Sequence, residues 1–210
     1  MYKTVVFDLD GTLLNTLTDL ADAGNRLCRK YGWPTHERQA YRYFVGNGIP
    51  KLVERLAPAD QRTPAVLEAA LADFKRDYGQ HLRDTTAPYP GIPEMLAKLK
   101  ADGVQLAVFS NKADALAKEV VKDYFGTQYF TIVRGQMTGV APKPAAEGTN
   151  ALLQALHADP ASTLYVGDSN VDVETAHNAN LPCCGAVWGF RTREELNAAG
   201  AEYLAENSDE

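Results

Sequence analysis

Short apolar runs alternate with helical segments through the second half of the chain, and this alternation limits the possible folds more than any other feature. The runs that we interpret as strands cover 104–109, 130–133, 163–166 and about 185–188. Helical periodicity fills the intervals, over 113–124, 145–156 and 170–179. Strands that alternate with helices form a parallel sheet through right-handed crossovers. We therefore expect an α/β fold, to which an apolar run at 4–7 adds one more buried strand.

A long helical stretch separates the strand at 4–7 from the other strands. Residues 15 to about 86 show the apolar periodicity of about four helices and no convincing strand. The turn-rich sequence Pro88-Tyr89-Pro90-Gly91 ends this stretch. A length of 210 residues suits a core with an insertion. We expect a core of residues 1–14 and 87–210, an inserted α-helical cap domain of residues 15–86, and a frayed end over about 203–210.

Charge and composition exclude several classes of function. The chain has 21 Lys and Arg against 27 Asp and Glu, a net charge of -6, so we expect no nucleic-acid partner. No apolar run is long enough for a membrane span, and the first residues are charged too early for a signal peptide. Three cysteines make no disulfide framework, which favours the reducing cytoplasm. The sequence leaves the oligomeric state open.

Polar side chains follow three of the predicted strands at the point where each strand ends. Asp8 and Asp10 follow the strand at 4–7, Ser110 follows the strand at 104–109, and Asp168 follows the strand at 163–166. In an open parallel sheet, ligands bind just outside the carboxyl ends of the strands. We therefore expect these side chains to converge, together with Asp172, one helical turn after Asp168.

Converged carboxylates repel one another, and a hard divalent cation relieves that repulsion. Mg²⁺ takes oxygen ligands, often one or two carboxylates together with a substrate phosphate. The alternative is that these acids form turns and cap helices, a role that suits Ser169 and Asp172. That alternative does not explain the two acids that flank Leu9 directly after a buried strand.

Several groups could bind the oxygens of a phosphate. Lys143 lies between two prolines where the helix over 145–156 should begin. A cation at a helix N-terminus is unfavourable because it opposes the helix dipole, and an anion bound there would explain the position of the lysine. The alternative for a single lysine is a loop position that faces solvent. Backbone N–H groups and small polar side chains at strand-to-helix turns also bind phosphate, and the chain offers Gly11-Thr12 and Ser110-Asn111.

Four segments, taken in order, resemble the four motifs of the haloacid dehalogenase superfamily. They are Asp8-Leu9-Asp10-Gly11-Thr12-Leu13, then Ser110-Asn111, then Lys143-Pro144, then Gly167-Asp168-Ser169-Asn170-Val171-Asp172. The resemblance covers nearly the whole chain and implies a Rossmann-like parallel sheet core with an inserted α-helical cap. It also implies Mg²⁺ as cofactor, held by Asp8, the backbone carbonyl of Asp10 and Asp168, with support from Asp172.

The resemblance also implies a mechanism. Asp8 would attack phosphorus and form an aspartyl-phosphate. Asp10 would protonate the leaving alkoxide and then deprotonate the hydrolytic water. Ser110 and Lys143 would hold the oxygens of the transferred group. The dehalogenases of the superfamily lack an acid at the position of Asp10, because a halide leaving group needs no proton, so Asp10 favours phosphoryl transfer.

Within the superfamily, the chain is most similar to phosphoglycolate phosphatases. The segments that carry this likeness are 45–53, which includes Gly46, Asn47 and Gly48 as candidate substrate-binding residues, and 188–196. We expect a phosphatase of a small phosphorylated metabolite, with 2-phosphoglycolate as the leading substrate. The alternatives are a pyrophosphatase, a nucleotidase, a sugar-phosphate phosphatase, a sugar phosphomutase, or a non-catalytic binding protein of the same fold.

Overall fold

A computed structural model describes residues 2–210 and divides the chain into two compact units. The first consists of Met1–Asn15 and Pro88–Glu210, and the second of Thr16–Ala87. Each boundary lies one residue from the position that the sequence suggests. The chain passes between the units through β2 (Leu14–Asn15) and β3 (Ala87–Pro88), which pair as a two-stranded sheet.

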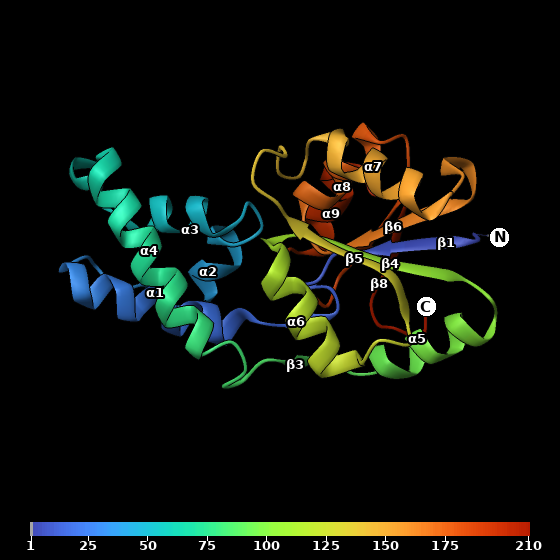
Figure 1. Ribbon diagram of the computed structural model, residues 1–210, viewed down its shortest axis with the longest axis horizontal. Helices are drawn as coiled ribbons and strands as arrows, with labels where there is room; N and C mark the ends of the chain where they lie inside the picture. Colours follow the sequence, from blue (N-terminus) through green and yellow to red (C-terminus); the bar gives the residue numbers. More distant parts are fainter. Residues whose placement is uncertain (1) are drawn as a thin grey trace. The chain divides into compact units, whose positions relative to one another are not determined.

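The first unit contains a six-stranded parallel sheet, so the expected α/β class is confirmed. The strand order is β5-β4-β1-β6-β7-β8. Their bounds are Thr4–Phe7 for β1, Gln105–Ala113 for β4, Phe130–Gln136 for β5, Thr163–Gly167 for β6, Cys183–Ala186 for β7 and Tyr203–Ala205 for β8. Figure 1 shows helices on both faces of this sheet, with α5 and α6 on one side and α7, α8 and α9 on the other.

The helices of this unit connect successive strands. They are α5 (Ile92–Ala101), α6 (Asp114–Phe125), α7 (Ala146–Leu156), α8 (Asn170–Asn178), α9 (Arg193–Ala199) and the short 3₁₀ helix η2 (Pro160–Ser162). β1 lies in the middle of the sheet, where Phe7 pairs with Val108 of β4 and with Val166 of β6. This register brings the residues that follow the three strands to one edge of the sheet.

The apolar core of this unit explains why the sequence of β1 is a continuous apolar run. Val6 is fully buried between Ala107 and Tyr165, its partners on the two neighbouring strands. A central parallel strand is covered on both faces and therefore carries no polar alternation. The surrounding cluster includes Leu152 of α7 and Val173 of α8, so the helices on one face close over the same core.

Three details of the predicted secondary structure were wrong. The expected fraying of residues 203–210 is corrected by β8, which pairs in parallel with β7 and buries Ala205. The strand predicted near 185–188 lies two residues earlier, because the chain turns after Ala186. β4 continues past residue 109 to Ala113, with an irregular register against β5. Its end therefore holds Ser110, Asn111 and Lys112 inside the sheet rather than after it.

The second unit is helical, with α1 (Leu17–Tyr31), α2 (Arg38–Phe44), α3 (Ile49–Leu56), α4 (Pro64–Gln80) and the 3₁₀ helix η1 (Ala59–Gln61). Its core holds fully buried aromatic side chains, among them Tyr41, Phe74 and Tyr78. Gly24 allows α1 to approach α2, since a Cβ there would lie 2.5 Å from the Tyr41 ring. The amphipathic pattern of the sequence therefore buries one face of each long helix.

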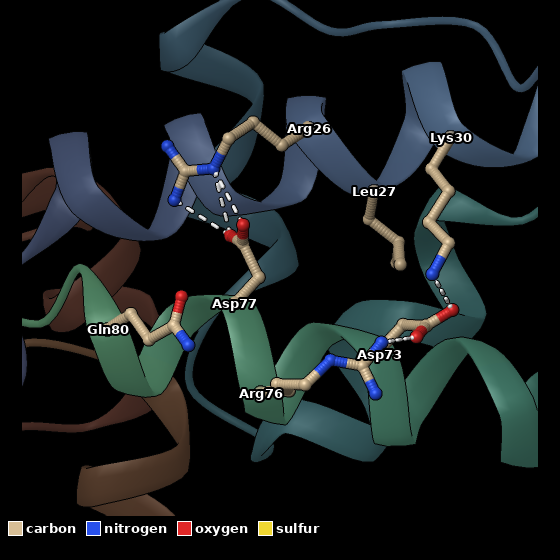
Figure 2. A pocket seen from close by; sticks show the side chains of 7 residues that line it. All are labelled: Arg26, Leu27, Lys30, Asp73, Arg76, Asp77 and Gln80. Carbon is tan, nitrogen blue, oxygen red and sulfur yellow. Dashed lines mark hydrogen bonds and ion pairs between the residues drawn. The ribbon is translucent and has the colours of Figure 1, made fainter.

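Charged side chains join α1 and α4 at the surface of the second unit. Arg26 pairs with Asp77 at 2.8 Å, and Lys30 pairs with Asp73 at 2.6 Å, as Figure 2 shows. Arg76 also contacts Asp73. These partly exposed pairs add modest stability to a contact that the buried aromatic residues already define.

A buried carboxylate ties the two ends of the second unit together. Asp19, in the first turn of α1, is 2% exposed. Its Oδ1 accepts hydrogen bonds from the backbone N–H and hydroxyl of Thr85, and its Oδ2 accepts the same two from Thr86. Charge-assisted hydrogen bonds are among the stronger ones in proteins. Asp19 therefore fixes the chain where it leaves this unit to the place where it entered.

Among residues 2–210, no helix combines the length and the apolar character that crossing a bilayer requires.

Candidate active site

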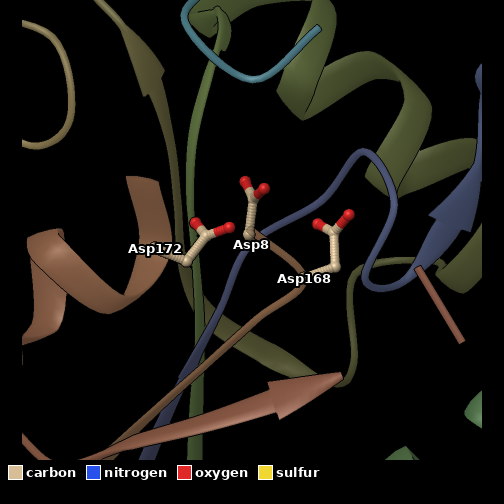
Figure 3. A group of neighbouring side chains, drawn as sticks. All are labelled: Asp8, Asp168 and Asp172. Carbon is tan, nitrogen blue, oxygen red and sulfur yellow. The ribbon is translucent and has the colours of Figure 1, made fainter. Parts of the chain in front are cut away.

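Three buried carboxyl groups meet at the carboxyl edge of the sheet. Asp8 follows β1, Asp168 follows β6, and Asp172 lies in the first turn of α8. One oxygen of each lies within 4.8 Å of one oxygen of the others. Figure 3 shows the three groups together, with Asp8 between the other two. Residues 160 positions apart in the sequence therefore share one site, as parallel strands with a common register require.

Asp168 is fixed by contacts to both of its oxygens. Oδ1 accepts a hydrogen bond from the Thr12 hydroxyl at 3.1 Å, and Oδ2 accepts one from the backbone N–H of Phe190 at 2.7 Å. The two glycines beside it leave no room for side chains, because a Cβ on Gly11 or Gly189 would lie 2.3 or 2.2 Å from atoms of Asp168. Thr12 therefore orients an acidic side chain of the site.

The segment after β7 also supports this loop. The indole N–H of Trp188 donates a hydrogen bond to the Thr12 carbonyl at 2.9 Å. The backbone N–H of Arg191 donates one to the Asp168 carbonyl at 3.3 Å. Residues 188–191 thus hold the loop after β1 and the loop after β6 in one arrangement.

Lys143 is buried between two of the carboxylates. Its Nζ lies 2.9 Å from Asp8 Oδ1 and 2.7 Å from Asp172 Oδ1. It also donates toward the Phe109 carbonyl at 3.3 Å and the Tyr165 hydroxyl at 3.2 Å. Burial disfavours the ammonium form, but the charges of Asp172 and Asp8 outweigh it and raise the pKa of Lys143 well above its usual value. The lysine is therefore a permanent cation of the site and not a solvent-facing loop residue.

Asp172 has the capping role that the sequence offered for it, and it also pairs with a buried lysine. Its Oδ2 accepts hydrogen bonds from the backbone N–H and hydroxyl of Ser169, which completes a capping box at the start of α8. Its Oδ1 pairs with Lys143. The helix cap thus holds the carboxylate in the orientation that places its other oxygen on the lysine.

Asn111 lies in the site, but its side chain contacts the chain itself. Its Oδ1 accepts a hydrogen bond from the backbone N–H of Lys143 at 2.8 Å, and its Nδ2 donates one to the Lys143 carbonyl at 3.2 Å. These two hydrogen bonds of the side-chain amide fix the loop before α7. Ser110 is also buried, and its Oγ accepts a hydrogen bond from the backbone N–H of Lys112 at 3.2 Å.

Sequence reasoning missed Lys112, which pairs with Asp10. The Lys112 side chain is 2% exposed, and its Nζ lies 3.1 and 3.3 Å from the two carboxylate oxygens of Asp10. A signal was present, because Lys112 lies two positions after Ser110, and alternate residues of a strand share a face. The prediction that the strand ended at residue 109 hid this relationship.

Burial opposes negative charge at the carboxylates. Desolvation, with a contribution from Asp172, raises the pKa of Asp8 to about 7 although Lys143 lowers it. Burial and the two neighbouring acids raise the pKa of Asp168 well above its usual range. The site contains four carboxyl groups and two lysines, and it has two net negative charges when all six are ionised. One divalent cation would neutralise them, so the donor set of hard oxygens fits Mg²⁺.

The predicted substrate-binding loop belongs to the second unit. Gly46, Asn47 and Gly48 connect α2 to α3, and both glycines have positive φ angles, 114° and 83°. Arg55 of α3 donates hydrogen bonds to Asn47 Oδ1 at 2.9 Å and to the Phe44 carbonyl at 2.8 Å. The loop thus has a defined conformation within its unit, and its role toward substrate remains a prediction.

Comparison with known proteins defines the class. The family model of haloacid dehalogenase-like hydrolases matches residues 5–186. The chain therefore belongs to the haloacid dehalogenase-like hydrolases. This match, together with the names of the relatives described next, confirms the expectation of a phosphatase.

Individual relatives are similar over most of their length. A phosphoglycolate phosphatase of Thiobacillus denitrificans is 31% identical over 191 residues, which are 90% of this chain and 84% of the relative. A phosphoglycolate phosphatase of Pseudomonas putida is 32% identical over 98% of this chain and 76% of the relative. A crystal structure from Lactobacillus delbrueckii subsp. bulgaricus, described as a candidate phosphoglycolate phosphatase, has a TM-score of 0.93 at 28% identity and covers 99% of this chain and 95% of that one.

Proposed function

We propose that the chain is a Mg²⁺-dependent phosphomonoester hydrolase that acts through an aspartyl-phosphate on Asp8, with 2-phosphoglycolate as substrate. The observation that carries this proposal is the placement of Lys143 between Asp8 and Asp172, beside Asp168. A cation at this position can hold a nucleophilic carboxylate and an incoming phosphoryl group together.

In the first step, an oxygen of the Asp8 carboxylate forms a bond to phosphorus. The bond between phosphorus and the ester oxygen breaks, and its electron pair remains on that oxygen. The Asp10 carboxyl group gives its proton to the same oxygen, so an alcohol leaves and the phosphoryl group remains on Asp8. Asp10 is two residues from the nucleophile, on the same loop, which supports this division of roles.

In the second step, a water molecule attacks the phosphorus of the aspartyl-phosphate. The Asp10 carboxylate accepts a proton from that water, and the bond between phosphorus and the Asp8 oxygen breaks. Phosphate leaves, and the Asp8 carboxylate and the Asp10 carboxyl group are restored. The sum of the two steps is hydrolysis of one phosphate ester by one water molecule.

Asp8, Asp168 and the backbone carbonyl of Asp10 would hold the Mg²⁺, with Asp172 in a supporting role. When bound, the cation neutralises charge on the phosphoryl oxygens and on the carboxylates. Asp172 contributes through its contact with Lys143, since both of its oxygens have partners in the chain. The two contacts that orient Asp168 leave it able to bind a metal through its remaining lone pairs.

The rest of the site orients the phosphoryl group. Lys143 and the hydroxyl of Ser110 bind its oxygens, and the backbone of Gly11 and Thr12 lines the same edge. Asn111 acts through Lys143, whose backbone it fixes at both ends. This assignment differs from direct substrate binding by Asn111, which the sequence suggested.

The substrate class rests on the named relatives and on the cap. Two phosphoglycolate phosphatases share 31% and 32% of their aligned residues with this chain. The loop at Gly46–Gly48 would contact the part of the substrate away from the phosphate. Small anionic esters suit a protein of net charge -6 only if the charge that binds them is local, as it is at Lys143.

A substrate panel tests the proposal. The purified protein is assayed for phosphate release from 2-phosphoglycolate, hexose phosphates, nucleotides and pyrophosphate, with Mg²⁺ and with a chelator. We expect 2-phosphoglycolate to be preferred and the chelator to abolish turnover. A preference of about tenfold or more for a hexose phosphate, equal to about 1.4 kcal/mol, would remove this substrate assignment. Conversion of glucose 1-phosphate without phosphate release would instead identify a phosphomutase.

Asp8→Asn tests the covalent mechanism. The amide cannot act as the nucleophile, so we expect hydrolysis to fall by at least about a thousandfold. Hydrolysis that is unaffected by this substitution would rule out the aspartyl-phosphate.

A further inference from the structure

Lys112 is a buried cation that the proposed chemistry does not use. It lies near the end of β4 with 2% of its side chain exposed, whereas a lysine normally keeps its ammonium in water. Its Nζ lies 3.1 Å from one oxygen of Asp10 and 3.3 Å from the other. Burial of such a charge is tolerated only where an opposite charge is held close to it. The carboxylate of Asp10 therefore compensates the buried charge of Lys112.

The backbone of Lys112 is as firmly placed as its side chain. Its N–H donates a hydrogen bond to Ser110 Oγ. Its carbonyl lies in a close approach to β5, since a Cβ on Gly135 would lie 2.4 Å from that oxygen. The backbone N–H of Gly135 in turn donates to Asp114 Oδ1 at 3.0 Å. The irregular end of β4 thus presents the lysine from a rigid support.

Asp10 has the most exposed side chain of the three acids that pair with buried lysines. Its side chain is 14% exposed, against 10% for that of Asp8 and 1% for that of Asp172. Backbone N–H groups and hydroxyls orient Asp168 and Asp172, whereas Lys112 contacts both oxygens of Asp10. A carboxyl group that transfers protons must stay within hydrogen-bond reach of the reacting oxygen. An error of about 1 Å in such a placement can lower a rate about a hundredfold.

We propose that Lys112 is a positioning residue that holds the carboxyl group of Asp10 in place for both proton transfers. This inference rests on the proposed function, in which Asp10 is the acid and base. Lys143 contacts the proposed nucleophile, Asp8, and Lys112 orients the proposed proton-transfer group, Asp10. Loss of Lys112 therefore slows turnover without weakening the binding of the phosphate ester.

The test is a double-mutant cycle of Lys112→Met and Asp10→Asn, assayed with 2-phosphoglycolate and phenyl phosphate in the presence of Mg²⁺. We expect K112M to lower kcat about 10- to 100-fold while KM stays within about threefold of the original value. The double variant should be no slower than D10N alone, because a residue that acts through Asp10 has no effect once Asp10 is replaced. Two independent effects, multiplied in the double variant, would overturn the proposal.

The leaving group supplies a second readout. p-Nitrophenyl phosphate has a leaving group, p-nitrophenolate, that departs without a proton. With this substrate, the initial burst of p-nitrophenol, which reports the transfer to Asp8, should be the same for K112M and the unchanged protein. The later steady rate, which includes hydrolysis of the aspartyl-phosphate, should fall. A burst slowed as much as the reaction of phenyl phosphate would contradict the proposal. A raised KM with unchanged kcat would also overturn it, because Lys112 would then bind the substrate directly.

Controls separate this inference from folding and from the proposed function. Lys122→Met removes a lysine at an exposed position of α6 and should leave kcat unchanged. If K112M does not fold, Lys112→Gln takes its place in the same cycle. Lys112→Arg, which keeps the charge, should recover part of kcat if the contact to Asp10 matters. If D8N remains active, the proposed function fails; if D8N is inactive but the cycle is additive, only the role of Lys112 fails.

Discussion

Replacement of Asp8 by asparagine should make the metal-free protein more stable, although it removes the proposed nucleophile. In the folded chain, burial raises the pKa of Asp8 to about 7 despite the attraction of Lys143. In the unfolded chain the same group titrates near about 4. As pH rises between these values, the unfolded chain loses the proton first, so the free energy of unfolding falls with rising pH. The full difference is on the order of 4 kcal/mol above pH about 7.

Asparagine resembles the neutral carboxyl group in shape and carries no charge at any pH. The difference in the free energy of unfolding between D8N and the unchanged protein should therefore be small at pH about 4 and grow toward pH about 8. Urea titration in the presence of a chelator measures it. Asp102→Asn, at an exposed position at the end of α5, is the control and should show no such growth.

Added Mg²⁺ should reverse the order. Ligands that bind only the folded state stabilise it by an amount that grows with the logarithm of their affinity, and D8N lacks one of the proposed carboxylate ligands. The unchanged protein should therefore gain more stability from Mg²⁺ than D8N does. If D8N is instead less stable than the unchanged protein at pH about 8 without metal, burial does not oppose the charge of Asp8 and the expected order is refuted.

Three further substitutions test the supports of the site and of the second unit. Lys143→Met leaves two buried carboxylates without their common cation, and urea unfolding near pH about 8 should show a loss of about 3 kcal/mol or more. Gly189→Ala places a Cβ 2.2 Å from the Cβ of Asp168, so calorimetry should show Mg²⁺ bound about tenfold or more weakly. Asp19→Ala leaves four hydrogen-bond donors of Thr85 and Thr86 without their acceptor, and limited proteolysis should cut the helical unit faster by about tenfold or more.

The convergence of the acids could be predicted because it depends only on topology. Once the apolar runs are interpreted as parallel strands, the residues after β1 and β6 must reach the same edge of the sheet. The register of Phe7 with Val166 fulfils that condition, and Asp8 and Asp168 follow it. Asp172 then comes one helical turn later. These placements required no knowledge of side-chain contacts.

Contacts that depend on where an element ends could not be predicted in the same way. The chain after residue 205 carries charged and small polar residues, which are typical of a free end, yet the three residues before them form β8, and Val187 donates a backbone hydrogen bond to Ala205. Pairing with an existing strand stabilises a segment whose own residues give little indication of one. Asn111 is a similar case, because its two bonds to Lys143 follow from the path of a distant loop.

The partner of Lys112 could have been predicted from the sequence by combining strand alternation with the need of a buried charge for an opposite one. Alternation along a strand places Lys112 on the same face as Ser110, and burial of that face requires an opposite charge nearby. β1 is the neighbour of β4, so the loop after β1 supplies the nearest acids, and Lys143 already pairs with Asp8. Asp10 remains as the partner, which is what the structure contains. The two acids of that loop thus pair with different buried lysines, and in the proposed mechanism this separation would let one carboxylate attack while the other moves protons.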